Sequence, residues 1–92
     1  MSEKRDRITI MNDMLEFIRS KGDKAKPTQV MYRANLSHAM LKEYLTELLE
    51  KQLITEQKSK DEKRTYSLTT KGFEFLKDYQ QMRGFLESYD LT

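Results

Sequence analysis

Apolar residues recur every three or four positions over the first 20 residues, which is the spacing of one face of a helix. They form two adjacent stripes: Ile8, Met11, Leu15 and Ile18, and beside these Ile10, Met14 and Phe17. The pattern predicts a helix from about Ser2 to Ser20 that is buried over a wide angle. Gly22 is expected to end this helix, and residues 20–26 form a polar loop after it.

A short helix and a longer one are predicted next, separated by a tight turn. Pro27 suits the first turn of a helix, where its missing N–H would have no partner, and residues 28–34 give about two turns. The break falls at Asn35, because asparagine tolerates the left-handed conformation of a tight turn. Ser37 is expected to cap a third helix that runs to Lys51. The apolar face of this helix consists of Met40, Leu41, Tyr44, Leu45, Leu48 and Leu49.

The second half of the chain predicts a hairpin followed by a long helix. Residues 53–57 form a short strand, and residues 66–69 alternate apolar and polar as a half-buried strand does. The charged stretch 58–64 lies between them as the hairpin tip. A last helix runs from near Thr70 to about Tyr89, and its apolar positions include Phe73, Phe75, Leu76, Tyr79, Met82, Phe85 and Leu86.

This order of elements predicts the fold class. Two helices joined by a tight turn form a helix-turn-helix, and a hairpin directly after them is a wing. We expect a mainly α fold with a small β-hairpin wing (α+β), in which a winged helix-turn-helix occupies residues 1–70. Residues 71–92 then form a C-terminal dimerisation helix within the same compact unit. A chain of 92 residues is too short for two independent cores.

Composition argues against several functional classes. The chain has no cysteine, which removes disulfides, thiolate nucleophiles and cysteine-based zinc sites. His38 is the only histidine, and the glycines at 22, 72 and 84 are scattered singly, so neither a metal site nor a phosphate-binding loop is expected. We therefore expect no enzymatic activity and no cofactor. No apolar run approaches the roughly 20 residues that span a bilayer, and residues 1–7 are too charged for a secretory signal, so a cytoplasmic protein is expected.

Charge is unevenly distributed along the chain. The net charge of +2 is too mild to indicate nucleic-acid binding by itself, so the distribution matters more than the sum. Basic residues gather in two turn-like segments, 19–33 and 58–64, whereas the tail from 74 to 92 is acidic. These two segments are the candidates for contact with a polyanion.

The turn between the second and third helices resembles a known family. Residues 30–37 read Val-Met-Tyr-Arg-Ala-Asn-Leu-Ser, which is similar to the Met-Tyr-Lys-Ala-Asn-Leu-Ser stretch of archaeal winged-helix-turn-helix DNA-binding regulators. That group includes small dimeric chromatin-associated proteins with a C-terminal coiled-coil helix. The resemblance extends to residues 41–45, 53–54 and 68–72, and covers about residues 5–88. Two positions depart from it: Gln29 stands where relatives often have a basic residue, and Gln52 where many have glycine.

The resemblance implies a homodimer that binds double-stranded DNA in transcription regulation or as a chromatin-associated protein at the nucleoid. The third helix would enter the major groove and present His38, Lys42 and Thr46 near its N-terminus. The wing would contact the DNA backbone or the minor groove through Lys58, Lys60, Lys63 and Arg64. The other predicted DNA contacts are Lys26, Thr28, Gln29, Arg33 and Ser37. The alternatives are a solubilising wing and a solvated His38 with no special role.

Tyr32 and Tyr44 fall within helical patterns, so they are interpreted as core or backbone-bonding groups rather than base-stacking platforms. The last helix carries the seam of a coiled coil, since its apolar residues step by four, three, four and three. The residues of this seam are Phe75, Tyr79, Met82, Leu86 and Tyr89. They predict a homodimer joined through the last helix, and the resemblance and rod geometry favour antiparallel pairing. The competing hypothesis is a winged helix that mediates protein contacts in a larger assembly.

Overall fold

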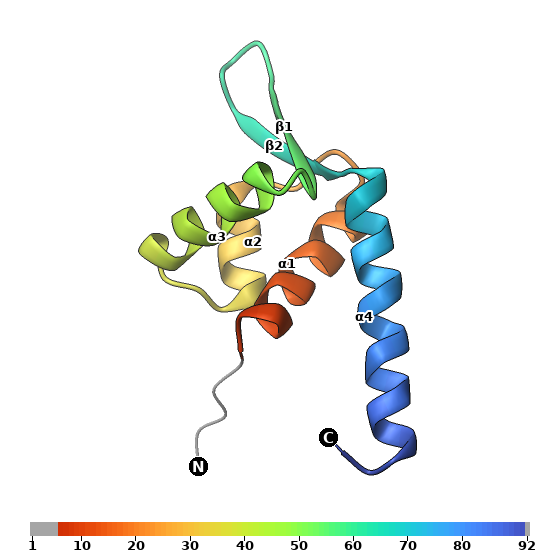
Figure 1. The fold of residues 1–92 in the computed structure, drawn as a ribbon. Helices are drawn as coiled ribbons and strands as arrows, with labels where there is room; N and C mark the ends of the chain where they lie inside the picture. The colour runs from red at the N-terminus through yellow and green to blue at the C-terminus, as the bar shows by residue number, and fades with distance from the viewer. Residues whose placement is uncertain (1–5, 92) are drawn as a thin grey trace.

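A computed structural model describes residues 6–91 and confirms the predicted fold class. The elements in chain order are α1 (Arg7–Lys21), α2 (Pro27–Ala34), α3 (His38–Glu50), β1 (Ile54–Lys58), β2 (Arg64–Leu68) and α4 (Thr70–Ser88). Helices α1, α2 and α3 pack together, the hairpin projects from one end of them, and α4 runs down one side of the molecule (Figure 1). This is a helix-turn-helix with a wing and a long last helix.

Capping residues at the helix ends explain where the helices start and stop. The carboxylate of Asp6 accepts a hydrogen bond from the Thr9 N–H at 2.8 Å, so α1 begins at Arg7, and the earlier predicted start at residue 2 lies outside the described residues. Gly22 ends α1 with a φ of 68°, a conformation open to glycine because it lacks a Cβ. Asn35 is left-handed with a φ of 59°, and the Ser37 hydroxyl accepts from the Met40 N–H at 3.2 Å. Both predictions for this turn are confirmed.

The core lies where α1, α2, α3 and the base of the hairpin meet. Its largest fully buried side chains are Met14, Leu15, Ile18, Val30, Leu48 and Ile54. Three predictions about the apolar positions were wrong. Ile8, expected on the buried face of the first helix, is 45% exposed. Met40 lies on the outer flank of the first turn of α3 and is 38% exposed, and Tyr32 is 79% exposed on α2. Tyr44 is buried as predicted, with the Arg7 guanidinium 5.7 Å from its ring centroid.

The hairpin is antiparallel, with Ile54 opposite Leu68 and Lys58 opposite Arg64. Both strands are shifted by one or two residues from the predicted bounds, because pairing extends further toward the tip. Sequence reasoning also missed a contact on the other edge of β2. There the N–H of Tyr66 donates to the carbonyl of Ala25 at 2.9 Å, and the Ala25 side chain is fully buried. The loop before α2, predicted to be simply polar, therefore ties the wing to the helices.

The start of α4 packs tightly against the segment that leads into the wing. The Thr69 hydroxyl accepts from the N–H of Gly72 and donates to the Gln52 carbonyl at 2.7 Å. Gln52 has a φ of 62°, so the residue that replaces the family's usual glycine does adopt the left-handed conformation. A Cβ at Gly72 would overlap the carbonyl oxygen of Leu53 and lie 2.9 Å from Cγ of Leu68. Glycine at 72 is therefore required by close packing.

This packing predicts opposite effects of one substitution at two glycines of α4. Gly72→Ala should lower the free energy of unfolding by about 1–3 kcal/mol, because the backbone of Leu53 would have to move. Gly84→Ala is the matched control, since a Cβ there meets nothing within 4 Å, and it should raise stability by about 1 kcal/mol through helix propensity. Urea denaturation measures both values. Equal effects of the two substitutions would contradict the packing described for Gly72.

Candidate nucleic-acid interface

The outward face of α3 and the inner face of the wing line one groove. His38, Lys42 and Thr46 lie on successive turns of α3, because helix positions four apart share a face, and all three are exposed. Together with the wing residues Glu56 and Arg64 they line a groove of about 450 Å³. The apolar floor of the groove includes Leu41, Leu45, Leu49, Pro27 and the ring of Tyr66. The structure thus brings the three predicted α3 residues together with one predicted residue of the wing.

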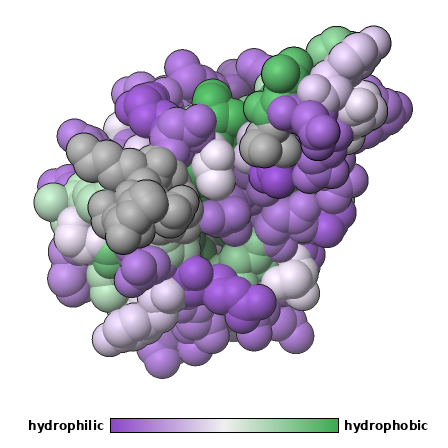
Figure 2. Space-filling model, turned by 90° about the horizontal axis from the view of Figure 1, so that it is seen from below, coloured by the Kyte–Doolittle hydropathy of each residue, from purple (hydrophilic) through white to green (hydrophobic). Residues whose placement is uncertain are grey.

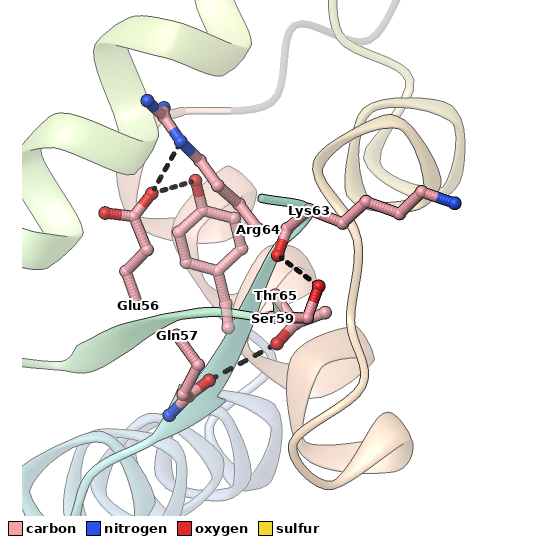
Figure 3. A network of polar contacts seen from close by, with 7 residues as sticks. Glu56, Gln57, Ser59, Lys63, Arg64 and Thr65 are labelled. Carbon is pink, nitrogen blue, oxygen red and sulfur yellow. Dashed lines mark hydrogen bonds and ion pairs between the residues drawn. The ribbon is translucent and has the colours of Figure 1, made fainter. Parts of the chain in front are cut away.

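The predicted basic cluster of the wing is divided by the hairpin. Neighbouring residues of a strand point to opposite faces, and Lys63 and Arg64 extend in different directions from the hairpin (Figure 3). Arg64 extends toward α3, with which it lines the groove, and its Nε lies 3.4 Å from Oε2 of Glu56. Lys63 lies at the tip, where its Nζ is 3.8 Å from Oδ2 of Asp61. The four wing cations are therefore not one equivalent patch.

A carboxylate and a phenol accompany Arg64 on its face of the hairpin. Glu56 is opposite Tyr66 in the register, and the Tyr66 hydroxyl donates to Oε2 of Glu56 at 3.4 Å. Burial, and next the negative charge of Glu56, raise the pKa of Tyr66 above its ordinary value. Sequence reasoning missed Glu56 and Tyr66 as groove residues. The alternation of the two strands was visible in the sequence, but the register that places these residues opposite one another was not.

The paired strand residues on the other face of the hairpin are polar and uncharged. The Gln57 side-chain amide donates to Oγ of Ser67 at 2.7 Å and to Oγ1 of Thr55 at 3.1 Å, and Thr65 donates to Oε1 of Gln57 at 3.5 Å. At the tip, the N–H of Ser59 donates to the Lys63 carbonyl at 3.0 Å. The two faces of the paired strands therefore offer different chemistry: neutral hydrogen-bonding groups on one side and the ion pair of Glu56 with Arg64 on the other, while the ion pair of Lys63 with Asp61 lies at the tip.

Cationic side chains also occur away from these ion pairs. Lys58 and Lys60 are exposed, and within residues 6–91 neither forms an ion pair. Lys26 and Thr28 are exposed at the start of α2. These predicted contacts are exposed, but none of them lines the groove beside α3.

The remaining predicted contacts have roles in the fold. The Gln29 side-chain oxygen accepts from the N–H of Lys26 at 3.1 Å, and Ser37 caps α3. Arg33 does not join the groove beside α3. It lines a separate groove between α1 and α2, where its guanidinium lies 5.8 Å from the centroid of the Phe17 ring.

A second surface follows α4. The exposed Ile8 of α1 lines a mainly apolar groove with Phe75, Tyr79 and Met82, and Asp78 lines it as well. Tyr79 is largely buried within the chain, with its hydroxyl 3.1 Å from Oγ1 of Thr9. Farther along α4 the large apolar side chains are exposed: Met82 is 44% exposed, Phe85 60% and Tyr89 64%. A view from below shows hydrophobic surface among mainly hydrophilic residues, including some in the hollow near the centre (Figure 2).

Comparison with known proteins identifies the architecture. A family model described as winged helix-turn-helix matches residues 4–87. A structure of Sso10a-2, a DNA-binding protein from Sulfolobus solfataricus, superposes with a TM-score of 0.73 at 24% identity over 94% of this chain and 90% of that one. MepR, a transcription regulator of the Staphylococcus aureus multidrug efflux pump MepA, gives 0.76 at 15% identity over 87% of this chain and 60% of that one.

A MarR family transcriptional regulator from Silicibacter pomeroyi gives a TM-score of 0.74 at 18% identity, over 88% of this chain and 54% of that one. At these identities the structural likenesses establish the fold. Comparison with curated protein sequences found no match. None of the helices within residues 6–91 is both long and apolar enough to cross a membrane.

The contact between Tyr66 and Glu56 predicts a pH-dependent signal. Absorbance titration of the parent, with Tyr66→Phe as the reference, should show Tyr66 ionising above the ordinary tyrosine value of about 10. The folded state favours the protonated phenol of Tyr66. The stability that this preference contributes is therefore fully present below the ordinary tyrosine pKa and is lost as the pH rises through the raised pKa. Glu56→Gln should lower the pKa of Tyr66, since burial remains but the nearby charge is gone. An unchanged pKa in Glu56→Gln would show that the two groups do not interact.

Proposed function

The chain belongs to the winged helix-turn-helix family, and on this basis we propose that it binds double-stranded DNA through the groove between α3 and the wing. The observation that carries the proposal is the convergence of His38, Lys42 and Thr46 with Arg64 in that groove. Sso10a-2 is described as a DNA-binding protein, and MepR has been solved in complex with DNA. The role that fits is that of a transcriptional regulator or chromatin-associated protein acting at the nucleoid in the cytoplasm.

The outward face of α3 has the chemistry to read base edges in the major groove. The ammonium of Lys42 suits the N7 and O6 acceptors of guanine, and Thr46 offers a hydroxyl and a methyl group that can contact a thymine methyl. His38 begins the helix, where side chains of a recognition helix come nearest to the bases. Glu43 and Glu50 are also exposed on α3, and their charge repels phosphate. Close approach is therefore expected over the first turns of the helix only.

Phosphate contacts are expected to flank the groove. Lys58 and Lys60 are exposed on the wing, and neither forms an ion pair with another residue in the range 6–91. Lys26 and Thr28 offer a cation and a hydroxyl at the start of α2. Such contacts position a protein on duplex DNA and supply most of its non-specific affinity.

Neutralising the unpaired wing lysines tests this proposal. Lys58→Gln with Lys60→Gln should weaken binding to a mixed-sequence duplex and reduce the slope of log K against log salt by about two. Lys71→Gln with Lys77→Gln removes the same charge from exposed positions of α4 and should change the slope by much less. Fluorescence anisotropy at several salt concentrations measures both. A parent that fails to bind duplex at low salt would favour the alternative hypothesis, a protein-interaction module.

We further propose that the chain forms a homodimer through α4. Support comes from the exposed apolar side chains of its second half and from the apolar groove beside Ile8, because contiguous apolar surface of this kind is unusual on a monomer. The exposed Met82 and Tyr89 and the half-buried Leu86 would pack against the second copy, together with the part of Phe75 that this chain's core leaves uncovered. Tyr79 already packs within the chain. Antiparallel pairing would place the two DNA-binding grooves toward opposite ends of one rod and raise the avidity for a long duplex.

Charged residues in this surface should separate the two copies. Met82→Lys with Leu86→Lys is expected to give a folded monomer, since each buried apolar side chain contributes about 1.5–3 kcal/mol to association. Gln80→Lys with Gln81→Lys adds the same charge to exposed positions of α4 that lie off the predicted seam, and should leave a dimer. Sedimentation equilibrium at tens of micromolar distinguishes these states. Sedimentation of the parent as a monomer would refute the dimer proposal.

A further inference from the structure

Glu56 places a negative charge in the groove that is proposed to receive DNA. It lines the groove with Lys42, Thr46 and Arg64, although a carboxylate repels the phosphate backbone. Apart from Glu56, the charged side chains that line this groove are the cations Lys42 and Arg64. The contacts of this carboxylate with Tyr66 and Arg64 indicate its role.

Glu56 is held in place by the fold as well as by Arg64. Its Oε2 accepts from the Tyr66 hydroxyl at 3.4 Å and lies 3.4 Å from Nε of Arg64. The Tyr66 side chain is 3% exposed, and its backbone N–H is bonded to Ala25. The carboxylate therefore rests on a buried part of the structure, and a phenol hydrogen bond restricts its position.

Arg64 is the more exposed partner of this pair. Its side chain is 57% exposed, against 31% for Glu56. The contact with Glu56 engages Nε, and Arg64 extends toward α3 in the groove (Figure 3). A guanidinium has five N–H donors, so its terminal nitrogens stay available to a ligand inside the groove. The pair as a whole, however, has no net charge.

We propose that Glu56 is a positioning residue that holds Arg64 in the groove and withholds its charge from general contacts with phosphate. The inference rests on the proposed DNA-binding function and concerns the selectivity of the same site. Cations that neutralise phosphates release counterions and so supply sequence-independent affinity. An arginine already neutralised by Glu56 adds little to this sequence-independent affinity. It can still donate hydrogen bonds to a base or phosphate that reaches its terminal N–H groups in the groove. Glu56 thereby lowers background affinity for arbitrary sequences.

A double-mutant cycle on one mixed-sequence duplex tests the proposal. It compares the parent chain with Glu56→Gln, Arg64→Gln and the double variant. Glu56→Gln should bind the duplex roughly three- to tenfold more tightly at low salt and steepen the salt slope by about one, because Arg64 is released to a phosphate. Arg64→Gln alone should weaken binding, because it removes a cation of the groove and leaves the charge of Glu56 uncompensated. In the Arg64→Gln background, the gain from Glu56→Gln should be smaller than in the parent, because no arginine is left to be released to a phosphate.

The matched control is Glu62→Gln, which removes the same charge from the tip of the same hairpin, where no ion pair with Arg64 exists. A gain in Glu62→Gln as large as that in Glu56→Gln would show simple repulsion of DNA and overturn the inference. A Glu56→Gln gain that is equally large or larger without Arg64 would overturn it as well. Failure of the parent to bind any duplex would instead refute the proposed function, and the inference with it.

Discussion

The position of the wing depends on the contacts of Tyr66. A two-stranded hairpin alone is marginally stable in water, and here β2 is fixed on both edges, by β1 and by the carbonyl of Ala25. The buried ring of Tyr66 adds apolar contacts at the base of the hairpin, and its hydroxyl reaches Glu56. Since Ala25 directly precedes the segment that begins α2, one residue links the wing to the helix-turn-helix. The groove beside α3 has a defined shape because this link fixes its outer wall.

The helix-turn-helix could be predicted from the sequence because its signals are local. Asn35 tolerates a left-handed backbone and Ser37 caps a helix wherever they occur in such a segment, and both behave in the structure as expected. What sequence reasoning missed depends on contacts between distant segments. The bridge from Ala25, the exposure of Met40 and Tyr32, and the pairing of Glu56 with Arg64 all follow from packing and strand register. The residue types alone predict a uniformly basic wing. In the structure, Lys63 and Arg64 form ion pairs, whereas Lys58 and Lys60 form none within the described residues.

Helix α4 serves two different environments along its length. Its first turns close the core, where Gly72 permits contact with Leu53 and Leu76 is buried. Its last turns carry large exposed apolar side chains, including Phe85 and Tyr89. A small domain gains little further stability from its own core, so a helix that extends beyond that core gives it a surface for association. The proposed dimer surface and the proposed DNA-binding groove thus lie on separate parts of one short chain.

The central claim is that duplex DNA binds in the groove between α3 and the wing. The most direct test follows the backbone amide resonances of the isotopically labelled protein during titration with a short mixed-sequence duplex. The account predicts that the largest shifts map to the first turns of α3, the start of α2 and the hairpin, with small changes in α1 and the second half of α4. Shifts concentrated along α1 and α4 instead, or none at low salt, would contradict it.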